Sequence, residues 1–163
     1  MQDKKYLIEI SVPQQKLYLS ENGKVLASYD VSTARNGVGE MINSECTPRG
    51  RHVISEKIGD ECEINSVFVG RKPTGECYTT GLREQYPERD WILTRILRLQ
   101  GIEEGINKGG DVDTHARMIY IHGSPEDVPM GLPGSHGCIR MNNRDVIQLF
   151  DKVSTGTEVI IQG

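Results

Sequence analysis

Long apolar runs are missing from this chain of 163 residues: none approaches the roughly 18 residues that a membrane-spanning helix needs. A basic patch is missing as well, because the 19 lysines and arginines are scattered and are outnumbered by 23 acidic residues. These absences argue against membrane insertion and against nucleic acid as a partner. No internal repeat, low-complexity tract or linker divides the sequence, so we expect a single domain over residues 1–163.

Closely spaced cysteine pairs are also missing. The four cysteines, Cys46, Cys62, Cys77 and Cys138, form no Cys-x-x-Cys pair, which leaves a zinc ribbon or a redox motif without support. If Cys138 stays free as a nucleophile, the other three are an odd number and fit a reducing compartment better than a secreted protein. The first residues lead straight into an expected strand without an apolar signal core. We therefore expect a cytoplasmic protein; a periplasmic protein whose signal peptide was removed is the alternative.

The pattern that is present is mostly that of β-strands. Asn22-Gly23 between two β-rich runs predicts a hairpin, with strands at 17–19 and 25–31. A helix is predicted over 145–153, where apolar residues recur at helical spacing and Asn142 or Asn143 can cap the start. Residues 70–90 are predicted to be a long irregular segment, and we expect the region 70–110 to cap a cleft. Further strands are expected at 7–10, 51–55, 64–69, 118–121 and 157–161.

The strongest chemical signal is the run Ser-His-Gly-Cys-Ile-Arg at residues 135–140, with His122-Gly123 upstream. These are the residue types that a cysteine nucleophile with a histidine base requires. We predict that Cys138 supplies the sulfur and that His122 accepts the thiol proton and returns it to a leaving amine. A neighbouring imidazole is expected to lower the pKa of the thiol. Gly137 lets the backbone approach a substrate, and the N–H groups of Gly137 and Cys138 are candidates for an oxyanion hole.

Several neighbouring residues have two interpretations each. His136 is placed with the catalytic residues: it either tunes the thiolate or bonds to the backbone, and we favour the structural role. Arg140 either grips a substrate carboxylate or braces the loop. Ser135 is expected to form the turn or to bond to a histidine. The predicted substrate-binding residues are Arg140, Ser135, Gly123, Tyr120 and Trp91.

A metal site is the competing interpretation of the same residues. His122, His136 and Cys138 would then be three zinc ligands. We disfavour this because His136 and Cys138 are separated only by Gly137 and no fourth ligand stands out besides His115. His52 and His115 are expected to be surface or packing residues. We predict no metal and no cofactor.

The same residues resemble the signature of the L,D-transpeptidase catalytic domain family, of YkuD or ErfK/YbiS type. The resemblance rests on His122-Gly-Ser and on the Ser-His-Gly-Cys-Ile-Arg-Met run at 135–141. It extends to the opening strands at 7–11 and 15–19, to Thr-Pro-Arg-Gly-Arg-His-Val-Ile at 47–54, and to the closing strand at 156–161. His52 stands where the family more often has an aromatic residue. The family implies a β-sandwich or barrel-like domain with a C-terminal helix, and a backbone carbonyl that orients the His122 ring.

The resemblance also implies a substrate, the stem peptides or muropeptides of bacterial peptidoglycan. The enzyme would attack the carbonyl of the third stem residue, hold it as a thioester on Cys138 and release D-Ala; carbapenems would acylate the same sulfur. We expect a monomeric L,D-carboxypeptidase that trims tetrapeptides in murein recycling. The alternatives are a periplasmic transpeptidase that forms 3→3 cross-links or exchanges D-amino acids and, less favoured, a non-catalytic muropeptide-binding module.

Overall fold

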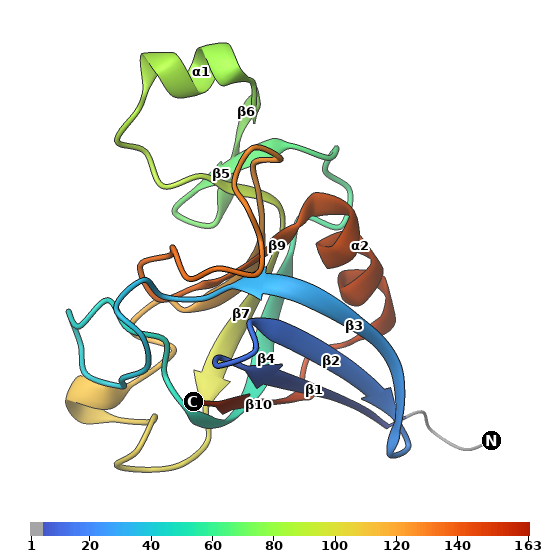
Figure 1. Cartoon of the computed structure of the whole chain (residues 1–163), viewed down its shortest axis with the longest axis vertical. Helices are drawn as coiled ribbons and strands as arrows, with labels where there is room; N and C mark the ends of the chain where they lie inside the picture. Colours follow the sequence, from blue (N-terminus) through green and yellow to red (C-terminus); the bar gives the residue numbers. More distant parts are fainter. Residues whose placement is uncertain (1–4) are drawn as a thin grey trace.

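The computed structural model describes residues 5–163, and over these residues one sheet of ten strands carries two α-helices and a short 3₁₀ helix (Figure 1). The helices are α1 (Thr80–Gln85), η1 (Gly110–Val112) and α2 (Asn143–Lys152). The strands are β1 (Tyr6–Ser11), β2 (Lys16–Glu21), β3 (Lys24–Ser32), β4 (Gly50–Ile58), β5 (Ser66–Val69), β6 (Lys72–Cys77), β7 (Ile92–Gly101), β8 (Tyr120–Ser124), β9 (Ile139–Asn142) and β10 (Glu158–Gln162).

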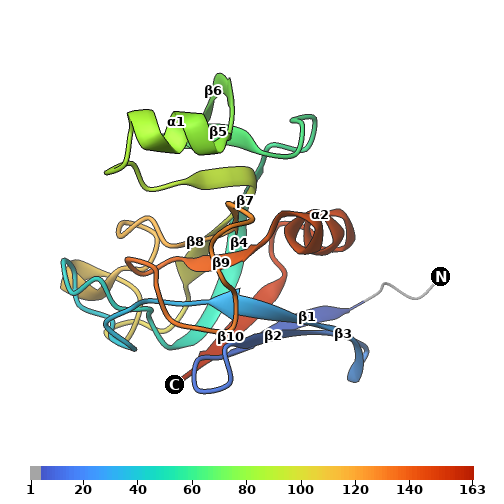
Figure 2. The same ribbon diagram turned by 45° about the horizontal axis from the view of Figure 1, so that its top comes forward.

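The sheet closes on itself. Its strands follow the order β4-β10-β1-β2-β3-β9-β8-β7-β5-β6, and β4 also pairs with β7. This pairing closes the strands from β4 to β7 into a barrel-like ring, while β5 and β6 continue beyond it. Figures 1 and 2 show β5, β6 and α1 standing apart from the ring, with α2 packed beside it. The mainly β, barrel-like fold with a helix near the C-terminus is confirmed.

Alternating apolar residues build the core inside this ring. Ile8 and Ile10 of β1 are fully buried, and Leu17 and Leu19 of β2 face them across an antiparallel pair. Residues two apart on a strand point to the same face, so each strand presents one apolar face to the core. Helix α2 adds Val146, Leu149 and Phe150 to the same cluster. The core therefore fixes the ring strands, including those that carry the predicted catalytic residues.

The expected hairpin, the other expected strands (β1, β4, β5, β8 and β10) and helix α2 are present, whereas the ring strands β7 and β9 were not predicted. The structure also chooses between the two candidate caps of α2: the Asn142 side chain accepts a hydrogen bond from the Arg144 N–H at 3.0 Å. Asn143 is instead buried, and its Oδ1 accepts a hydrogen bond from Thr94 Oγ1 at 2.7 Å. His52 is a packing residue, buried and hydrogen-bonded to the Gly50 carbonyl and to Thr114.

The prediction of an irregular segment over 70–90 is wrong. Residues 72–77 form β6, which pairs with β5, and residues 80–85 form α1. Neither element leaves a hydrophobic periodicity in the sequence, because β6 has no buried residue and α1 has no buried face. The Thr79 hydroxyl caps α1 by accepting a hydrogen bond from the Leu82 N–H at 3.0 Å.

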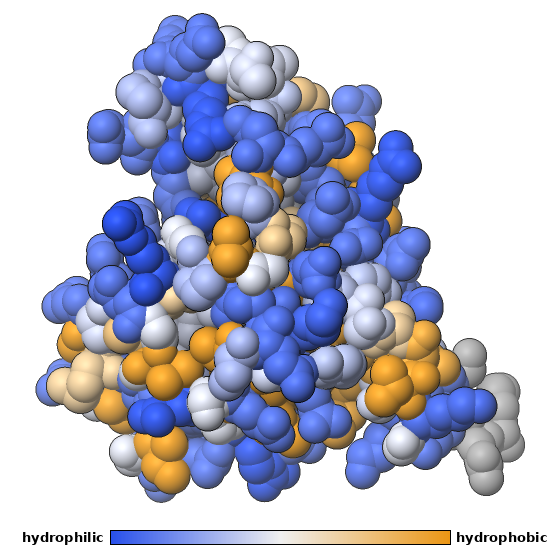
Figure 3. All heavy atoms as spheres, viewed as in Figure 1, coloured by the Kyte–Doolittle hydropathy of each residue, from blue (hydrophilic) through white to orange (hydrophobic). Residues whose placement is uncertain are grey.

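The outer surface is mostly hydrophilic in the view of Figure 3, with apolar side chains in several separate groups. Across residues 5–163, no helix is long and apolar enough to cross a membrane.

Candidate active site

Two adjacent parallel strands bring the predicted nucleophile and base together. In the β8–β9 pair, Ile121 lies opposite Ile139 and His122 opposite Arg140. Cys138 stands immediately before β9, and His122 is the third residue of β8. Because both strands belong to the closed ring, the packing of the core fixes these positions. A loop of 14 residues, 125–138, connects two strands that lie side by side.

His122 is arranged as a neutral base. Its side chain is buried, and Nδ1 lies 2.6 Å from the Gly123 carbonyl oxygen. Only an N–H can donate to a carbonyl, so Nδ1 carries the proton and Nε2 is left with a free lone pair. Burial lowers the pKa of His122, outweighing the opposing effect of the Asp90 carboxylate. The ring is therefore uncharged near neutral pH and is able to accept a proton.

Cys138 is arranged as a protonated thiol. Its Sγ accepts a hydrogen bond from the Tyr120 N–H at 3.3 Å and lies 3.5 Å from the Met118 carbonyl oxygen. Burial raises the pKa of Cys138 to about 12, although the Tyr120 N–H and the nearby Arg140 oppose the shift. The expectation that an imidazole lowers this pKa is wrong for this state, because a neutral His122 supplies no positive charge.

Both groups open into one cavity of about 310 Å³. Of the residues predicted from the sequence, it is lined by Cys138, His122, His136, Ser135, Arg140 and Tyr120. The remaining lining residues are Gly70, Arg71, Asp90, Ile92, Arg117, Met118 and Ile119. Three arginines face a single carboxylate, that of Asp90, so the walls carry a net positive charge.

The loop before Cys138 is held by its own hydrogen bonds. Ser135 Oγ donates to the Cys138 carbonyl and accepts from the Gly137 N–H at 3.2 Å. The Gly137 carbonyl in turn accepts from Thr47 Oγ1 at 2.9 Å. Ser135 is therefore a turn former, and the Gly137 N–H, a candidate oxyanion donor, is occupied in this state.

Gly137 is required by the backbone. Its φ is +133°, and a Cβ at this position would lie 3.0 Å from Ile119 Cδ1 and 3.3 Å from the Cys46 carbonyl oxygen. Cys46 belongs to the loop between β3 and β4, which Arg117 holds in place. Arg117 Nη2 donates to the Cys46 carbonyl at 2.7 Å, and the guanidinium also reaches Gly39, Glu40 and Ser44.

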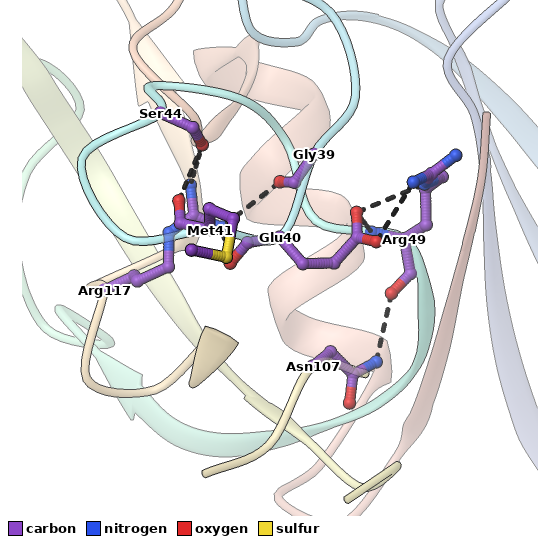
Figure 4. Close-up of polar contacts among 7 residues, drawn as sticks. All are labelled: Gly39, Glu40, Met41, Ser44, Arg49, Asn107 and Arg117. Carbon is purple, nitrogen blue, oxygen red and sulfur yellow. Dashed lines mark hydrogen bonds and ion pairs between the residues drawn. The ribbon is translucent and has the colours of Figure 1, made fainter. Parts of the chain in front are cut away.

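Figure 4 shows this loop, with Arg117 pointing into it from the segment before β8. On its other side Glu40 pairs with Arg49 at 3.1 Å, and the Arg49 carbonyl accepts from Asn107 Nδ2 at 3.0 Å. Burial lowers the pKa of Arg117. Arg117 was not predicted from the sequence, where nothing distinguishes it from the other scattered arginines.

Arg140 and His136 stand at the boundary of the cavity. Arg140 Nη1 donates to the Gly134 carbonyl at 3.1 Å, and Nη2 lies 3.5 Å from Asp90 Oδ1. The structure thus contains the brace that was one of the two interpretations of Arg140, with the guanidinium still facing the cavity. The His136 ring is exposed, and none of the described hydrogen bonds involves it.

Two predicted substrate-binding residues lie elsewhere. Gly123 does not line the cavity; a Cβ there would lie 2.4 Å from Asn143 Oδ1 and 2.5 Å from the Leu93 carbonyl oxygen. Its contribution is the carbonyl that fixes the His122 ring. Trp91 lines a second, neighbouring cavity of about 220 Å³. Tyr120 does line the first cavity, and its hydroxyl accepts from Arg71 Nη1 at 3.1 Å.

None of the other cysteines lines this cavity. Cys46, Cys62 and Cys77 are free thiols, as is Cys138. Within the part of the chain that the structure describes, no group of three or more His, Cys, Asp or Glu side chains is arranged to hold a metal ion.

The fold agrees with the comparisons with known proteins. The family model of the L,D-transpeptidase catalytic domain, YkuD, matches residues 5–161. The chain therefore belongs to the L,D-transpeptidase catalytic domain family, as the sequence motifs predicted.

Individual relatives carry the same family name. The probable L,D-transpeptidase ErfK/SrfK of Salmonella typhimurium is 47% identical over 113 residues, which cover 61% of this chain and 37% of that protein. The probable L,D-transpeptidase YbiS of Escherichia coli is 46% identical over 43 residues, 26% of this chain and 14% of that protein. The chain thus spans well under two thirds of the length of these relatives.

Solved structures share the fold. L,D-transpeptidase 3 from Mycobacterium tuberculosis, in complex with a faropenem-derived adduct, aligns with a TM-score of 0.61 and 18% identity over 98% of this chain and 61% of that one. The L,D-transpeptidase LdtMt1 in complex with imipenem aligns with a TM-score of 0.58 and 17% identity, covering 98% and 59%.

Proposed function

We propose that this chain cleaves peptidoglycan stem tetrapeptides through a thioester on Cys138 and that water is its preferred acceptor, which makes it an L,D-carboxypeptidase. The observation that carries the proposal is the pairing of a protonated Cys138 with a neutral His122 in one cavity. The arginine-rich walls suit a stem peptide, which carries several carboxylates. Three unpaired thiols besides Cys138 support a reducing, cytoplasmic setting and hence a role in murein recycling.

The proposed steps follow from the proton positions. His122 Nε2 takes the thiol proton as Sγ attacks the carbonyl carbon of the third stem residue. The tetrahedral intermediate collapses, the C–N bond breaks, and the imidazolium returns the proton to the departing D-Ala amine. Water, deprotonated by the same imidazole, then attacks the thioester, and the C–S bond breaks to restore the thiol. A neutral thiol and a neutral base need no preformed ion pair, so the transfer of the proton is concerted with attack.

The test is to incubate the protein with a diaminopimelate-containing tetrapeptide, with and without excess D-Met, beside Cys138→Ala, and to identify products by mass spectrometry. We expect the tripeptide as the main product in both reactions and no product with Cys138→Ala. D-Met-substituted tetrapeptide or joined stems would instead identify a transpeptidase. A mass adduct of imipenem on the wild type, absent from Cys138→Ala, tests the nucleophile separately; its absence from both would contradict the proposal.

A further inference from the structure

The second cavity adjoins the first and shares a wall with it. Asp90, His136 and Arg140 line both cavities, and the ion pair between Arg140 and Asp90 lies in this wall. The proposed catalytic pair opens only into the first cavity. The remaining walls of the second come from Arg83 of α1, from the segment between α1 and β7, and from the end of β8 with the loop that follows it.

Two residues that line the second cavity, Trp91 and Ser124, each have a buried polar group without a partner. The Trp91 indole N–H and the Ser124 hydroxyl make no hydrogen bond to any described residue, although Trp91 is 7% and Ser124 is 2% exposed. The Trp91 ring is itself well fixed, because Tyr78 packs edge-on against it at 5.1 Å and the Arg89 guanidinium lies over it. Two other buried side-chain nitrogens, Nε of Arg95 and of Arg98, are also unpartnered but lie outside this cavity. Because buried donors are almost always paired in folded proteins, the Trp91 and Ser124 groups are the donors that a ligand in this cavity would satisfy.

The charges around the second cavity leave a small positive excess. Its lining includes three arginines, Arg83, Arg89 and Arg140, and two carboxylates, those of Glu88 and Asp90. Each of the three guanidiniums is ion-paired, with Asp127, Glu76 and Asp90 respectively, and keeps further N–H donors for a ligand. An indole N–H, a hydroxyl and a guanidinium are all donors to a carboxylate, and charge-assisted hydrogen bonds of this kind are the strong ones.

The distance between Ser124 and His122 along β8 relates the second cavity to the proposed catalytic base. Ser124 follows His122 by two residues on β8, so both side chains leave the strand on the same face, about 7 Å apart along it. An α-amino acid bridges such a span when its amine lies near the His122 ring and its carboxylate reaches the Ser124 hydroxyl.

We propose that the second cavity binds the free carboxylate of the D-residue that leaves the stem peptide or enters in exchange for it, with Trp91 and Ser124 as the donors. The inference rests on the proposed function for the identity of this residue. Departing and entering D-residues use the same subsite, because exchange is the reverse of release. A site that reads a terminal carboxylate favours the end of a tetrapeptide over an internal bond, which is what a carboxypeptidase requires.

The single tryptophan of the chain makes the test direct, because Trp91 fluorescence reports on the proposed site itself. Using Cys138→Ala to prevent chemistry, we would titrate D-methionine and, as the matched probe without a carboxylate, D-methioninamide. We expect a saturable change with D-methionine and binding at least about fivefold weaker for the amide. Ser124→Ala should weaken D-methionine by a similar factor, whereas Ser28→Ala, on the exposed face of β3, should not. Equal responses to acid and amide, or no response, would overturn the proposal and leave a buried water as the partner of both donors.

If free D-methionine binds too weakly for the titration, a kinetic measurement tests the same subsite. The wild type should prefer a tetrapeptide acid over its C-terminal amide, and Ser124→Ala should lose most of that preference, because the rate with the acid falls more than the rate with the amide. Acylation of the wild type by imipenem is measured alongside. Normal acylation without carboxylate preference would overturn this inference and leave the proposed function intact. Saturable D-methionine binding without any acylation of Cys138 would overturn the proposed function instead.

Discussion

The cavity that contains Cys138 and His122 has a floor and a rim that are built in different ways. The floor is formed by β7, β8 and β9, where all five residues of β8 are buried and β7 is buried along almost its whole length. The rim segment, residues 70–91, includes β6 and α1, which contain no buried residue. It is attached through a small apolar cluster around Trp91, Val67 and Leu93, and through polar contacts of Arg83 and Tyr78 with Asp127.

Under the proposed function, this difference assigns reactivity to the floor and substrate selection to the rim. Cys138 and His122 are fixed by strands whose register cannot slip without exposing the core. The rim supplies Arg71, Asp90 and Trp91 to the two cavities from elements that few buried contacts restrain. Elements of this kind change sequence and conformation at low cost, so we expect substrate choice to be adjusted there.

The largest effect on stability should come from a larger side chain in the tightly packed floor. Gly123→Ala places a methyl group 2.5 Å from the Leu93 carbonyl oxygen, a backbone atom that cannot move without shifting β7. We expect a loss of about 3 kcal/mol in the free energy of unfolding, with a fall in activity, measured by urea denaturation. The matched rim variant is Gly81→Ala in α1, where the nearest atom is 3.8 Å away. It should be neutral or stabilising by up to about 1 kcal/mol; equal destabilisation by both would refute the contrast.

A smaller effect is expected from pH on the rate of acylation. It depends only on Cys138 and His122, which are positioned by the floor strands. The raised pKa of Cys138 keeps the thiol protonated, so the rate of acylation should not rise through the range near pH 8.5 where an ordinary cysteine ionises. The rate should depend on His122, whose lowered pKa keeps it neutral at pH 7. Acylation by imipenem should therefore be flat from about pH 7 to 9 and fall about tenfold per unit below the pKa of His122. A step upward near pH 8.5 would show that the thiol ionises before it attacks.

How far the sequence predicted this molecule depends on the same division. Six of the eight ring strands, helix α2 and the placement of Cys138 near His122 were predicted, because core packing imposes periodic patterns and the motif is compact. The ring strands β7 and β9 were not: β7 is buried along most of its length and shows no alternation, and β9 has only four residues. The two rim elements β6 and α1 were missed, because exposed residues such as Lys72 and Thr80 leave no pattern. The raised pKa of Cys138 could not be anticipated either, because burial is a property of the folded cavity.

The smallest effect, and the one that separates rim from floor most directly, should come from shortening the rim. The segment 70–110, predicted to cap a cleft, includes residues 92–101, which form the central strand β7; for the rim segment 70–91 the capping role stays a prediction. Replacing α1 (Thr80–Gln85) by a short glycine–serine linker should leave acylation by imipenem within about twofold, because neither Cys138 nor His122 contacts it. The ratio of D-Met exchange to hydrolysis should change by about threefold or more, because Arg83 is removed from the second cavity. Arg83→Met in the intact chain separates loss of this side chain from loss of the helix. Equal losses of acylation and exchange would mean that the rim supports the floor and does not select the acceptor.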